Sequence, residues 1–348
     1  MFACPGKRQD QGQTFWSDPI VGVRIGNRPR ARLVEPGVRV IAYDRNGGPE
    51  VLELRDVPDP TPADGEVLID VETVGVNYRD VYEREGGYGS KPPAILGAEG
   101  AGTIAGTRER VAWSAVAGSY AERLAAPRDK LVPIPDEVST EVAAAALLQG
   151  MTAHYLAFDS YPIQEGDWVL VHAAAGGVGL LLTQIAKLRG GRVIATTSSE
   201  EKAALARQAG ADEVIGYEGF TARVREITGG EGVAAVYDGV GKTTFLEGLG
   251  ALRPYGRMIV YGAASGQPDA LDTAALAPLG SLYVQRPTLQ TYTRTPELLR
   301  ERARQLFELI ESRDLDIRIG ARYPLEQARQ AHEDLEARKT TGKLLLIT

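Results

Sequence analysis

From Val38 onward, short apolar segments are separated by glycine and proline, the pattern of a compact β domain. Val38–Tyr43 is predicted to be a strand, a turn follows at residues 46–48, and further strands are predicted at 51–54 and 66–71. Similar segments continue to about residue 134, so we expect a mostly antiparallel β domain. Residues 141–148 are rich in alanine and leucine and indicate a helix, which residues 154–158 prolong.

After residue 167 the pattern changes to an alternation of apolar strands and amphipathic helices. Strands are predicted at residues 168–172, 192–196, 213–215, 234–237, 257–261 and 281–284. The intervening helices are predicted at 178–189, 200–209, 221–227 and 244–252. This alternation predicts right-handed βαβ units and a parallel sheet covered by helices. Two helices, at 296–310 and 325–336, and a strand at 343–347 complete the prediction.

Length and charge narrow the class of protein. With 348 residues the chain is longer than one hydrophobic core usually organises, which predicts two domains. The formal net charge of -7 lacks the basic excess of nucleic-acid binders, so no nucleic-acid partner is expected. No apolar run approaches the roughly 20 residues of a membrane helix. A small-molecule enzyme is therefore the expectation.

The N-terminal region and the cysteine content bear on the cellular compartment. Residues 1–37 lack hydrophobic periodicity and mix basic residues with glycine and proline, so we expect a disordered or loosely attached extension. The single cysteine, Cys4, cannot form an internal disulfide, so nothing indicates an oxidising compartment. We expect a cytoplasmic protein.

Residues 172–179 connect an apolar strand to an amphipathic helix through a glycine-rich turn. The turn matches the dinucleotide-binding pattern G-x-G-x-x-G, except that Ala174 replaces the first glycine. Gly176 would let the backbone approach a pyrophosphate, and Gly179 would let the helix lie close to the strand. The N-terminus of the helix supplies N–H groups and a positive dipole end. The βαβ context favours a nucleotide site over a simple packing turn.

The end of the second predicted strand indicates which nucleotide is bound. NAD-binding proteins usually place Asp or Glu about 20 residues after the turn, to hold the ribose hydroxyls. This chain has the segment Thr196-Thr197-Ser198-Ser199 there, with Lys202 close behind. Hydroxyl groups and an ammonium suit a 2′-phosphate, so NADPH is the predicted cofactor. The alternative for Lys202 is a solvated helix residue.

The scarcity of metal ligands bears on the chemistry. The chain has a single cysteine, Cys4, so a Cys₄ zinc site is impossible. Its three histidines, at 154, 172 and 332, form no cluster that resembles a catalytic zinc set. We expect His154 and His172 to be core or packing residues and His332 to lie on a surface helix. Oxidation of an unactivated alcohol usually needs a Lewis acid, whereas a quinone or conjugated carbonyl is already polarised. Reduction of such an acceptor is the predicted reaction.

Several motifs occur in order along the chain: Val76-Asn77-Tyr78-Arg79-Asp80, Leu96-Gly97-Ala98-Glu99-Gly100, Leu148-Gln149-Gly150-Met151-Thr152-Ala153, the turn at 174–179 and Gly280-Ser281-Leu282-Tyr283-Val284-Gln285-Arg286-Pro287. From Val38 to the C-terminus the chain resembles the medium-chain dehydrogenase/reductase superfamily, in its quinone oxidoreductase (zeta-crystallin-like) branch. The resemblance implies an α/β protein with a GroES-like, mostly-β catalytic domain at 38–160 and 286–348. It also implies a Rossmann domain with a doubly wound parallel sheet at 161–285, a cleft between the domains, and a homodimer joined through the last Rossmann strand.

The resemblance also assigns residues to the site. It implies that Asn77, Tyr82 and Tyr88 line the nicotinamide and quinone pocket, with Thr152 near the nicotinamide. It implies NADPH contacts at Gly177, Val178, Lys202, Tyr217 and Arg338, in addition to Gly176, Gly179 and Ser198 from the motif analysis. Arg286 is expected near the cleft or the dimer edge, and Asp80 is expected to be a structural hydrogen-bonding residue. Zinc-dependent relatives carry Cys in place of Asn77 and His in place of Ala98.

Two other functions stay open at this point. An NADPH-dependent enoyl-thioester reductase of the same superfamily would use a tyrosine as proton donor, and Tyr88 fits that placement. A non-catalytic, crystallin-like NADPH-binding protein is the other alternative, although the glycine turn is intact. Quinone reduction is the favoured prediction because a polarised acceptor requires no metal.

Overall fold

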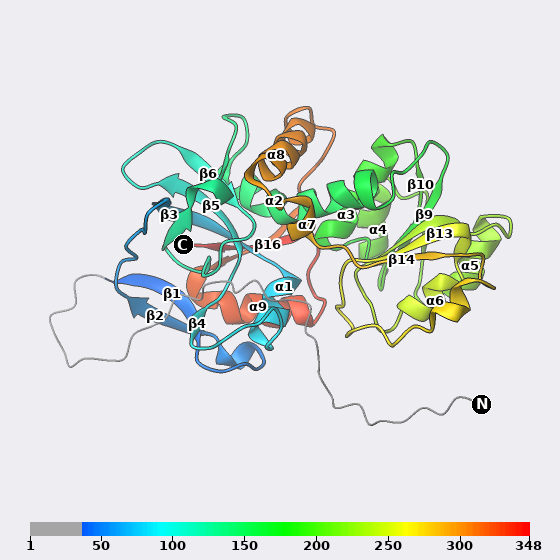
Figure 1. Ribbon diagram of the computed structural model, residues 1–348, viewed down its shortest axis with the longest axis horizontal. Helices are drawn as coiled ribbons and strands as arrows, with labels where there is room; N and C mark the ends of the chain where they lie inside the picture. The colour runs from blue at the N-terminus through cyan, green and yellow to red at the C-terminus, as the bar shows by residue number, and fades with distance from the viewer. Residues whose placement is uncertain (1–36) are drawn as a thin grey trace, which may run out of the picture.

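The computed structural model describes residues 37–348, so the extension expected at residues 1–37 lies almost wholly outside the described residues. The described chain forms a six-stranded sheet, a seven-stranded sheet and a small three-stranded sheet (Figure 1). The three-stranded sheet has the order β2-β1-β4 and is antiparallel. Its strands are β1 (Val38–Tyr43), β2 (Glu53–Val57) and β4 (Ala94–Ile95).

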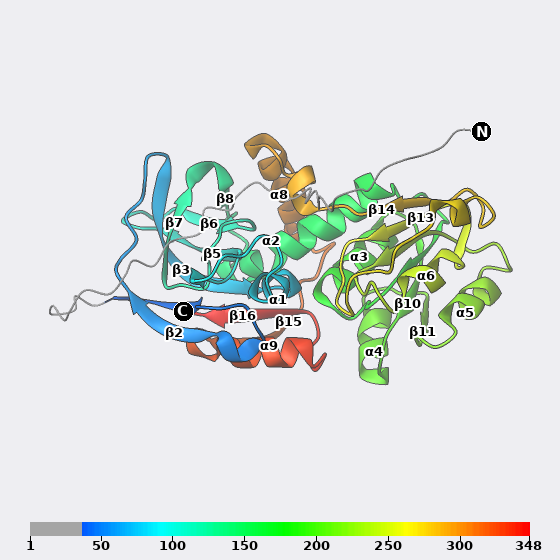
Figure 2. The same cartoon turned by 60° about the horizontal axis from the view of Figure 1, so that its bottom comes forward.

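The seven-stranded sheet has the order β15-β16-β3-β5-β6-β8, with β7 also paired to β3. All its pairs are antiparallel except β15 with β16, in agreement with the mostly antiparallel prediction. The strands are β3 (Glu66–Val76), β5 (Glu99–Ile104), β6 (Arg110–Trp113), β7 (Arg123–Pro127), β8 (Val132–Pro133), β15 (Ile319–Pro324) and β16 (Lys343–Ile347). Because β16 pairs with β3, the end of the chain lies among strands from its first third (Figure 2).

The six-stranded sheet is parallel throughout, as the alternation of strands and helices predicted. Its order is β11-β10-β9-β12-β13-β14. The strands are β9 (Trp168–Val171), β10 (Arg192–Thr196), β11 (Glu213–Ile215), β12 (Val233–Asp238), β13 (Leu252–Val260) and β14 (Tyr283–Gln285). The reversal of strand order around β9 is the topology that places ligands at the carboxyl ends of the strands.

The helices follow the predicted positions with a few corrections. Their bounds are α1 (Tyr78–Arg84), α2 (Thr140–Tyr155), α3 (Gly177–Leu188), α4 (Glu200–Gln208), α5 (Phe220–Ile227), α6 (Phe245–Leu249), α7 (Leu289–Tyr292), α8 (Pro296–Glu311) and α9 (Ala328–Glu336). A π-helical turn, Leu156–Ser160, continues α2, so the helical prediction for 154–158 is confirmed. None of the helices in residues 37–348 is long and apolar enough to cross a membrane.

Two predicted elements were wrong in their extent. The strand predicted at 51–54 is divided, because Pro49–Val51 forms a 3₁₀ turn that starts at a proline and β2 begins only at Glu53. The helix predicted at 244–252 ends at Leu249, because the chain enters β13 at Leu252. The buried apolar residues Val51 and Leu252 belong to the 3₁₀ turn and to β13, respectively.

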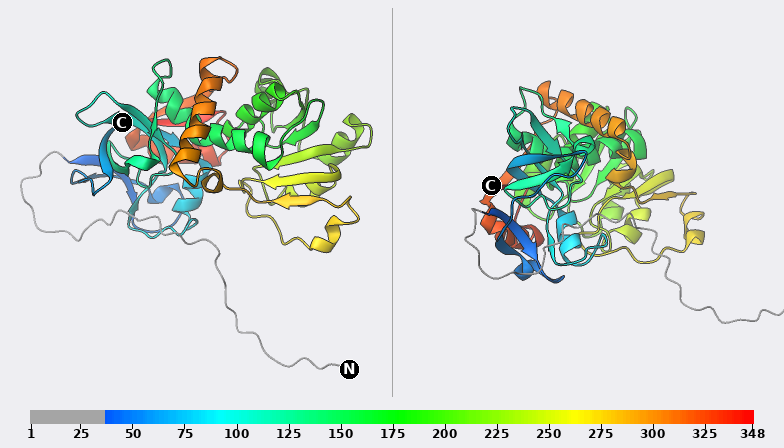
Figure 3. Two further views of the ribbon diagram at one scale, coloured as in Figure 1. Left: turned by 45° about the horizontal axis from the view of Figure 1, so that its top comes forward. Right: turned by 60° about the vertical axis from the view of Figure 1, so that its left-hand side comes forward.

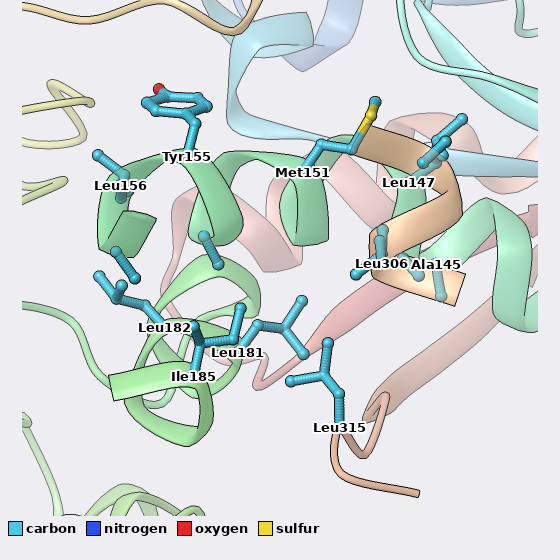
Figure 4. Close-up of a cluster of buried hydrophobic side chains, with 14 of the residues drawn as sticks. Ala145, Leu147, Met151, Tyr155, Leu156, Leu181, Leu182, Ile185, Leu306 and Leu315 are labelled. Carbon is cyan, nitrogen blue, oxygen red and sulfur yellow. The ribbon is translucent and has the colours of Figure 1, made fainter. Parts of the chain in front are cut away.

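The core is organised around α2, which is buried along most of its length. It contacts β5 and β6 of the seven-stranded sheet, the helix α3 that connects β9 to β10 in the parallel sheet, and α8 (Figure 3). Figure 4 shows Leu147 and Met151 of α2 close to Leu306 of α8, with Leu181 and Ile185 of α3 below. One hydrophobic cluster therefore extends from the seven-stranded sheet into the parallel sheet.

The prediction for His332 was wrong, because the side chain is fully buried on the inner face of α9. Its Nδ1 lies 3.0 Å from Arg84 Nη1 and its Nε2 lies 3.0 Å from Tyr120 Oη. A guanidinium only donates, so Nδ1 accepts and Nε2–H donates to Tyr120. The Tyr120 hydroxyl in turn donates to Asp80 Oδ2 at 3.1 Å. This buried chain connects the Arg84 cation to the Asp80 carboxylate, which confirms Asp80 as a structural hydrogen-bonding residue.

The buried His332 gives a testable dependence of stability on pH. Burial, and then the charge of Arg84, lower its pKa from 6.5 to about 3. Since the unfolded chain binds this proton more readily, its contribution to stability is complete above pH 6.5 and is lost as the pH falls toward 3. The loss from this one group is about 1.4 kcal/mol per pH unit.

We expect thermal unfolding to show a fall in Tm between pH 7 and pH 5 that is smaller in a His332→Gln variant, although that variant is less stable at pH 7. Parallel Tm profiles for the two proteins would contradict the assignment.

Candidate active site

The candidate site lies where α1, the loop after β13 and the end of α9 approach one another. A cavity of about 310 Å³ is lined there by Tyr78, Val81, Tyr82, Glu85, Ala263, Ala264, Gly266, Gln267 and Glu336. Ala263 and Ala264 follow the carboxyl end of β13, and the tyrosines come from α1, next to the seven-stranded sheet. The cavity therefore lies between the two large sheets, at the edge where a doubly wound sheet binds its ligands.

Two tyrosines fasten α1 to the loop after β13. The Tyr78 hydroxyl donates to Ala264 O at 3.2 Å, and the Tyr82 hydroxyl accepts from Ala263 N at 2.9 Å. The pKa of Tyr82 is raised, first of all by burial, so its phenol keeps its proton at neutral pH. The side chain predicted for the acceptor pocket thus lies in the cleft with a proton that it is free to donate.

Tyr88 lies beside Tyr82, with ring centroids 6.4 Å apart. Its backbone has φ 54°, a left-handed conformation between Gly87 and Gly89, and its side chain is 54% exposed. The Arg79 guanidinium stands 5.1 Å from the centre of the Tyr88 ring. The two predicted tyrosines therefore come together, but only Tyr82 lines the cavity, and Tyr88 is the more solvent-exposed of the two.

The side chain of Asn77 is buried and hydrogen-bonded within the protein. It is 3% exposed and precedes α1, where its backbone N–H donates to Asp80 Oδ2 at 2.9 Å. Its Nδ2 donates to Glu99 Oε2 at 2.7 Å and to Gly75 O at 3.1 Å, while its Oδ1 accepts from Lys343 Nζ at 2.8 Å. Both ends of the amide are thus held by the protein.

The sequence analysis did not find Glu99 and Lys343 as partners of Asn77. The sequence feature that could have indicated them is a charged residue next to an apolar segment. It occurs in Leu96-Gly97-Ala98-Glu99 and in Lys343-Leu344-Leu345-Leu346. Thr152 is also buried, and its hydroxyl donates to Leu148 O at 2.7 Å in α2.

The glycine turn has the shape that the motif predicts. A Cβ on Gly179 would lie 2.5 Å from Ala173 O, so only glycine lets α3 approach the turn after β9 this closely. A Cβ on Gly176 would approach a single atom, Ala173 O, at 3.2 Å, so this backbone is less crowded. The cap of α3 is Gly176 itself, with no side-chain hydrogen bond, and Gly177 and Val178 form the first residues of the helix. The N-terminus of α3 therefore has no side-chain cap, although Gln149 lies close to Gly177.

The predicted 2′-phosphate residues lie beside this turn. Lys202 Nζ donates to Arg338 O at 2.7 Å, and the Tyr217 hydroxyl accepts from Ala173 N at 3.1 Å. Partial burial, and then the positive charge of Arg338, lower the pKa of Lys202. Within residues 37–348 neither Lys202 nor Arg338 forms an ion pair. Ser198, just after the end of β10, is exposed. Two neighbouring cations without a carboxylate partner favour a bound anion.

The remaining candidates are structural. His172 is buried, with Nδ1 2.9 Å from Thr196 Oγ1, and His154 stacks on Phe158 with centroids 4.3 Å apart, so both are packing residues as expected. Arg286 Nη1 donates to Val260 O and Gly262 O, which places it at the end of β13 near the cleft. In the described part of the chain no three His, Cys, Asp or Glu side chains gather closely enough to hold a metal ion.

Comparison with known proteins gives a consistent assignment. Family models match at residues 63–136 (alcohol dehydrogenase GroES-like domain) and 177–312 (zinc-binding dehydrogenase). A quinone oxidoreductase of Pseudomonas aeruginosa is 43% identical over 320 residues, covering 88% of this chain and 98% of that protein. The chain belongs to the medium-chain dehydrogenase/reductase superfamily, in its quinone oxidoreductase branch. It is an oxidoreductase with a GroES-like domain and a Rossmann domain.

Solved structures of this branch have the same fold. A mycobacterial protein in complex with NADPH is 46% identical, with a TM-score of 0.87, and the match covers 89% of this chain and 100% of that one. The Escherichia coli quinone oxidoreductase in complex with NADPH is 38% identical, with the same TM-score and the same coverage of both chains. A 2-haloacrylate reductase of Burkholderia, 34% identical over 89% of this chain and 99% of that protein, also matches. The branch thus includes proteins named for different acceptors.

The two glycines of the turn give a prediction about stability. Gly179→Ala should lower the free energy of unfolding by about 1–3 kcal/mol, because the new methyl group meets the backbone of the turn at Ala173 and Ala174. Gly176→Ala, the matched variant, should lower it clearly less, because its methyl group approaches only one atom, Ala173 O, at 3.2 Å. Urea denaturation of both variants checks this, and equal losses would contradict the packing role of Gly179.

Proposed function

We propose that the chain transfers reducing equivalents from NADPH to a quinone or a similar activated carbonyl, without a metal. The observation that carries the proposal is the arrangement of the cleft. In this proposal the glycine turn, together with Lys202 and Arg338, forms the cofactor side; within residues 37–348 neither cation has an ion-pair partner. The tyrosines of α1, which line the cavity, form the acceptor side. Such a cleft binds a phosphorylated dinucleotide at one end and a flat apolar acceptor at the other.

The residues present fit the cofactor. The open backbone at Gly176 and the N–H groups of Gly177 and Val178 would hold the pyrophosphate, and Ser198, Lys202, Tyr217 and Arg338 would hold a 2′-phosphate. NADPH supplies a hydride to the acceptor when it is bound. The structures of related proteins in complex with NADPH support this choice of cofactor.

The proposed acceptor side is built around two tyrosines, Tyr82 and Tyr88. Tyr82 and Tyr88 offer ring surfaces for stacking, and the Tyr82 phenol holds a proton that can be given to an acceptor oxygen as negative charge develops there. Asn77 immediately precedes α1 and, like Thr152 of α2, is buried and hydrogen-bonded. We propose that these two residues form the inner wall of the acceptor site. The protein's contribution is to align the reactants and to exclude water.

The assembly and domain limits are part of the same proposal. We assign residues 38–160 and 286–348 to the catalytic domain and 161–285 to the NADPH-binding domain, on the membership of their strands in the two large sheets. A homodimer is supported by β14, an edge strand with Tyr283 and Val284 exposed, beside the 72% exposed Tyr255. Exposed apolar edges of this kind favour pairing with a second chain. The single cysteine supports a cytoplasmic enzyme.

The test of the function is NADPH oxidation by the purified protein, followed by absorbance. The acceptors to compare are 1,4-benzoquinone, 9,10-phenanthrenequinone, 2-chloroacrylate and crotonyl-CoA, each with and without EDTA. We expect quinone turnover that EDTA does not change. Turnover of crotonyl-CoA or 2-chloroacrylate alone would move the protein to enoyl or haloacrylate reduction, and Tyr88→Phe would then test the proton donor. Tight NADPH binding with no turnover would support a non-catalytic protein.

The preference for NADPH gives a separate prediction. Lys202→Ala should weaken NADPH binding by roughly 10-fold or more, because a charge-assisted contact to the 2′-phosphate contributes about 1.5–3 kcal/mol. The affinity for NADH should barely change, because NADH lacks that phosphate. Fluorescence titration of both nucleotides measures this, with Lys187→Ala, which removes an ammonium paired with Asp212, as the control. Equal weakening for both nucleotides would exclude the phosphate role.

A further inference from the structure

Glu99 and Lys343 form an ion pair in the interior of the protein. Their side chains are 0% and 1% exposed, and Lys343 Nζ lies 2.5 Å from Glu99 Oε2. Removing two charges from water costs several kcal/mol each, and apolar residues of the same volume are often equally or more stabilising at such places. Stability of the fold is therefore a weak reason for a charge pair here.

The carboxylate of Glu99 holds two segments that carry proposed site residues. Its Oε2 accepts from Asn77 Nδ2 at 2.7 Å, and its Oε1 accepts from Leu148 N at 2.6 Å. The carbonyl of the same Leu148 accepts from the Thr152 hydroxyl at 2.7 Å. One buried carboxylate thus connects to Asn77 directly and to Thr152 through a single α2 residue.

Lys343 completes the arrangement from the end of the chain. Its ammonium donates to Asn77 Oδ1 at 2.8 Å, so the two charges hold opposite ends of the same amide. The preceding residue, Gly342, donates its N–H to Ala175 O at 3.2 Å, in the glycine turn. The space is full, because a Cβ on Gly75 would lie 2.5 Å from Glu99 Oε2 and 2.8 Å from Lys343 Cε. The start of β16 therefore contacts the wall of the acceptor pocket and the turn that would hold the pyrophosphate.

We propose that Glu99 and Lys343 are positioning residues for the transfer of reducing equivalents. They fix the Asn77 amide and the Leu148–Thr152 turn of α2 beside the cleft, and they touch neither NADPH nor the acceptor. The inference rests on the proposed function, in which Asn77 and Thr152 form the wall next to the reacting groups. Misplacement of a reacting geometry by about 1 Å costs roughly 100-fold in rate, so loss of this pair acts on kcat.

The test uses the full-length double variant Glu99→Gln/Lys343→Met, which removes both charges and keeps both side-chain volumes. We expect its Tm to stay close to that of the parent, whereas Lys343→Met alone leaves a buried unpaired carboxylate and lowers Tm strongly. The kcat for quinone should fall at least about 10-fold in the double variant, while the Kd for NADPH changes less than about twofold. The isotope effect on kcat with NADPH deuterated at C4 should rise, because transfer becomes the slow step.

A matched control is available in the same elements. Glu141 of α2 and Arg322 of β15 form an exposed ion pair of 2.6 Å, so Glu141→Gln/Arg322→Met removes a pair that joins α2 to the C-terminal strands at the surface. This control should keep kcat and the isotope effect of the parent. An unchanged kcat and isotope effect in the Glu99→Gln/Lys343→Met protein would overturn the proposal.

Failure of the positioning role can be distinguished from failure of the proposed function. If the parent protein turns over no quinone, the function fails, and crystal structures of the parent and the double variant decide the positioning role by the orientation of the Asn77 amide. A rotated or shifted amide in the variant supports the role, and an unchanged amide excludes it.

Discussion

The burial of α2 between the two large sheets is the constraint on which the rest of the molecule depends. A helix that is apolar on nearly every side has no face to give to solvent, so it must be covered from several directions at once. The seven-stranded sheet, α3 and α8 provide that cover, and one hydrophobic cluster runs through all of them. The cleft lies at the edge of this junction, so its two walls are held at a distance set by core packing.

The polar residues assigned to the proposed site fall into two groups, which differ in their exposure to water. Lys202 and Arg338 lie at the periphery, where water screens the repulsion between their two positive charges. Asn77 and Glu99 lie inside, where an unpaired polar atom costs about 1–3 kcal/mol, and each finds its partners in the protein. In the proposed function, recognition of charge and alignment of the reacting groups are therefore carried out by separate groups of residues, one exposed to water and one buried.

How far the sequence predicts this structure depends on how local each signal is. The parallel sheet was predicted strand by strand, and β10 and β11 match the predicted limits, because buried parallel strands and amphipathic helices have strong periodicity of their own. Helix α1 and strand β15 were missed, because α1 is only seven residues long and β15 alternates half-buried with exposed residues. His332 was misplaced because nothing near it in the sequence reveals Tyr120, its partner 212 residues away.

The environment of Asn77 shows why site chemistry is harder to predict than fold. Motif comparison places Asn77 beside the acceptor, but the state of its amide depends on Glu99, 22 residues away, and on Lys343, 266 residues away. Neither contact has a local pattern, since each partner looks like a single polar residue beside an apolar run. The pairing exists only because β16 returns to β3 and brings the end of the chain to the first strands. The proposed inner wall is therefore completed by the last strand of the chain. A chain that lacks this strand has the glycine turn, Lys202 and Arg338, but not the partner that fixes the Asn77 amide.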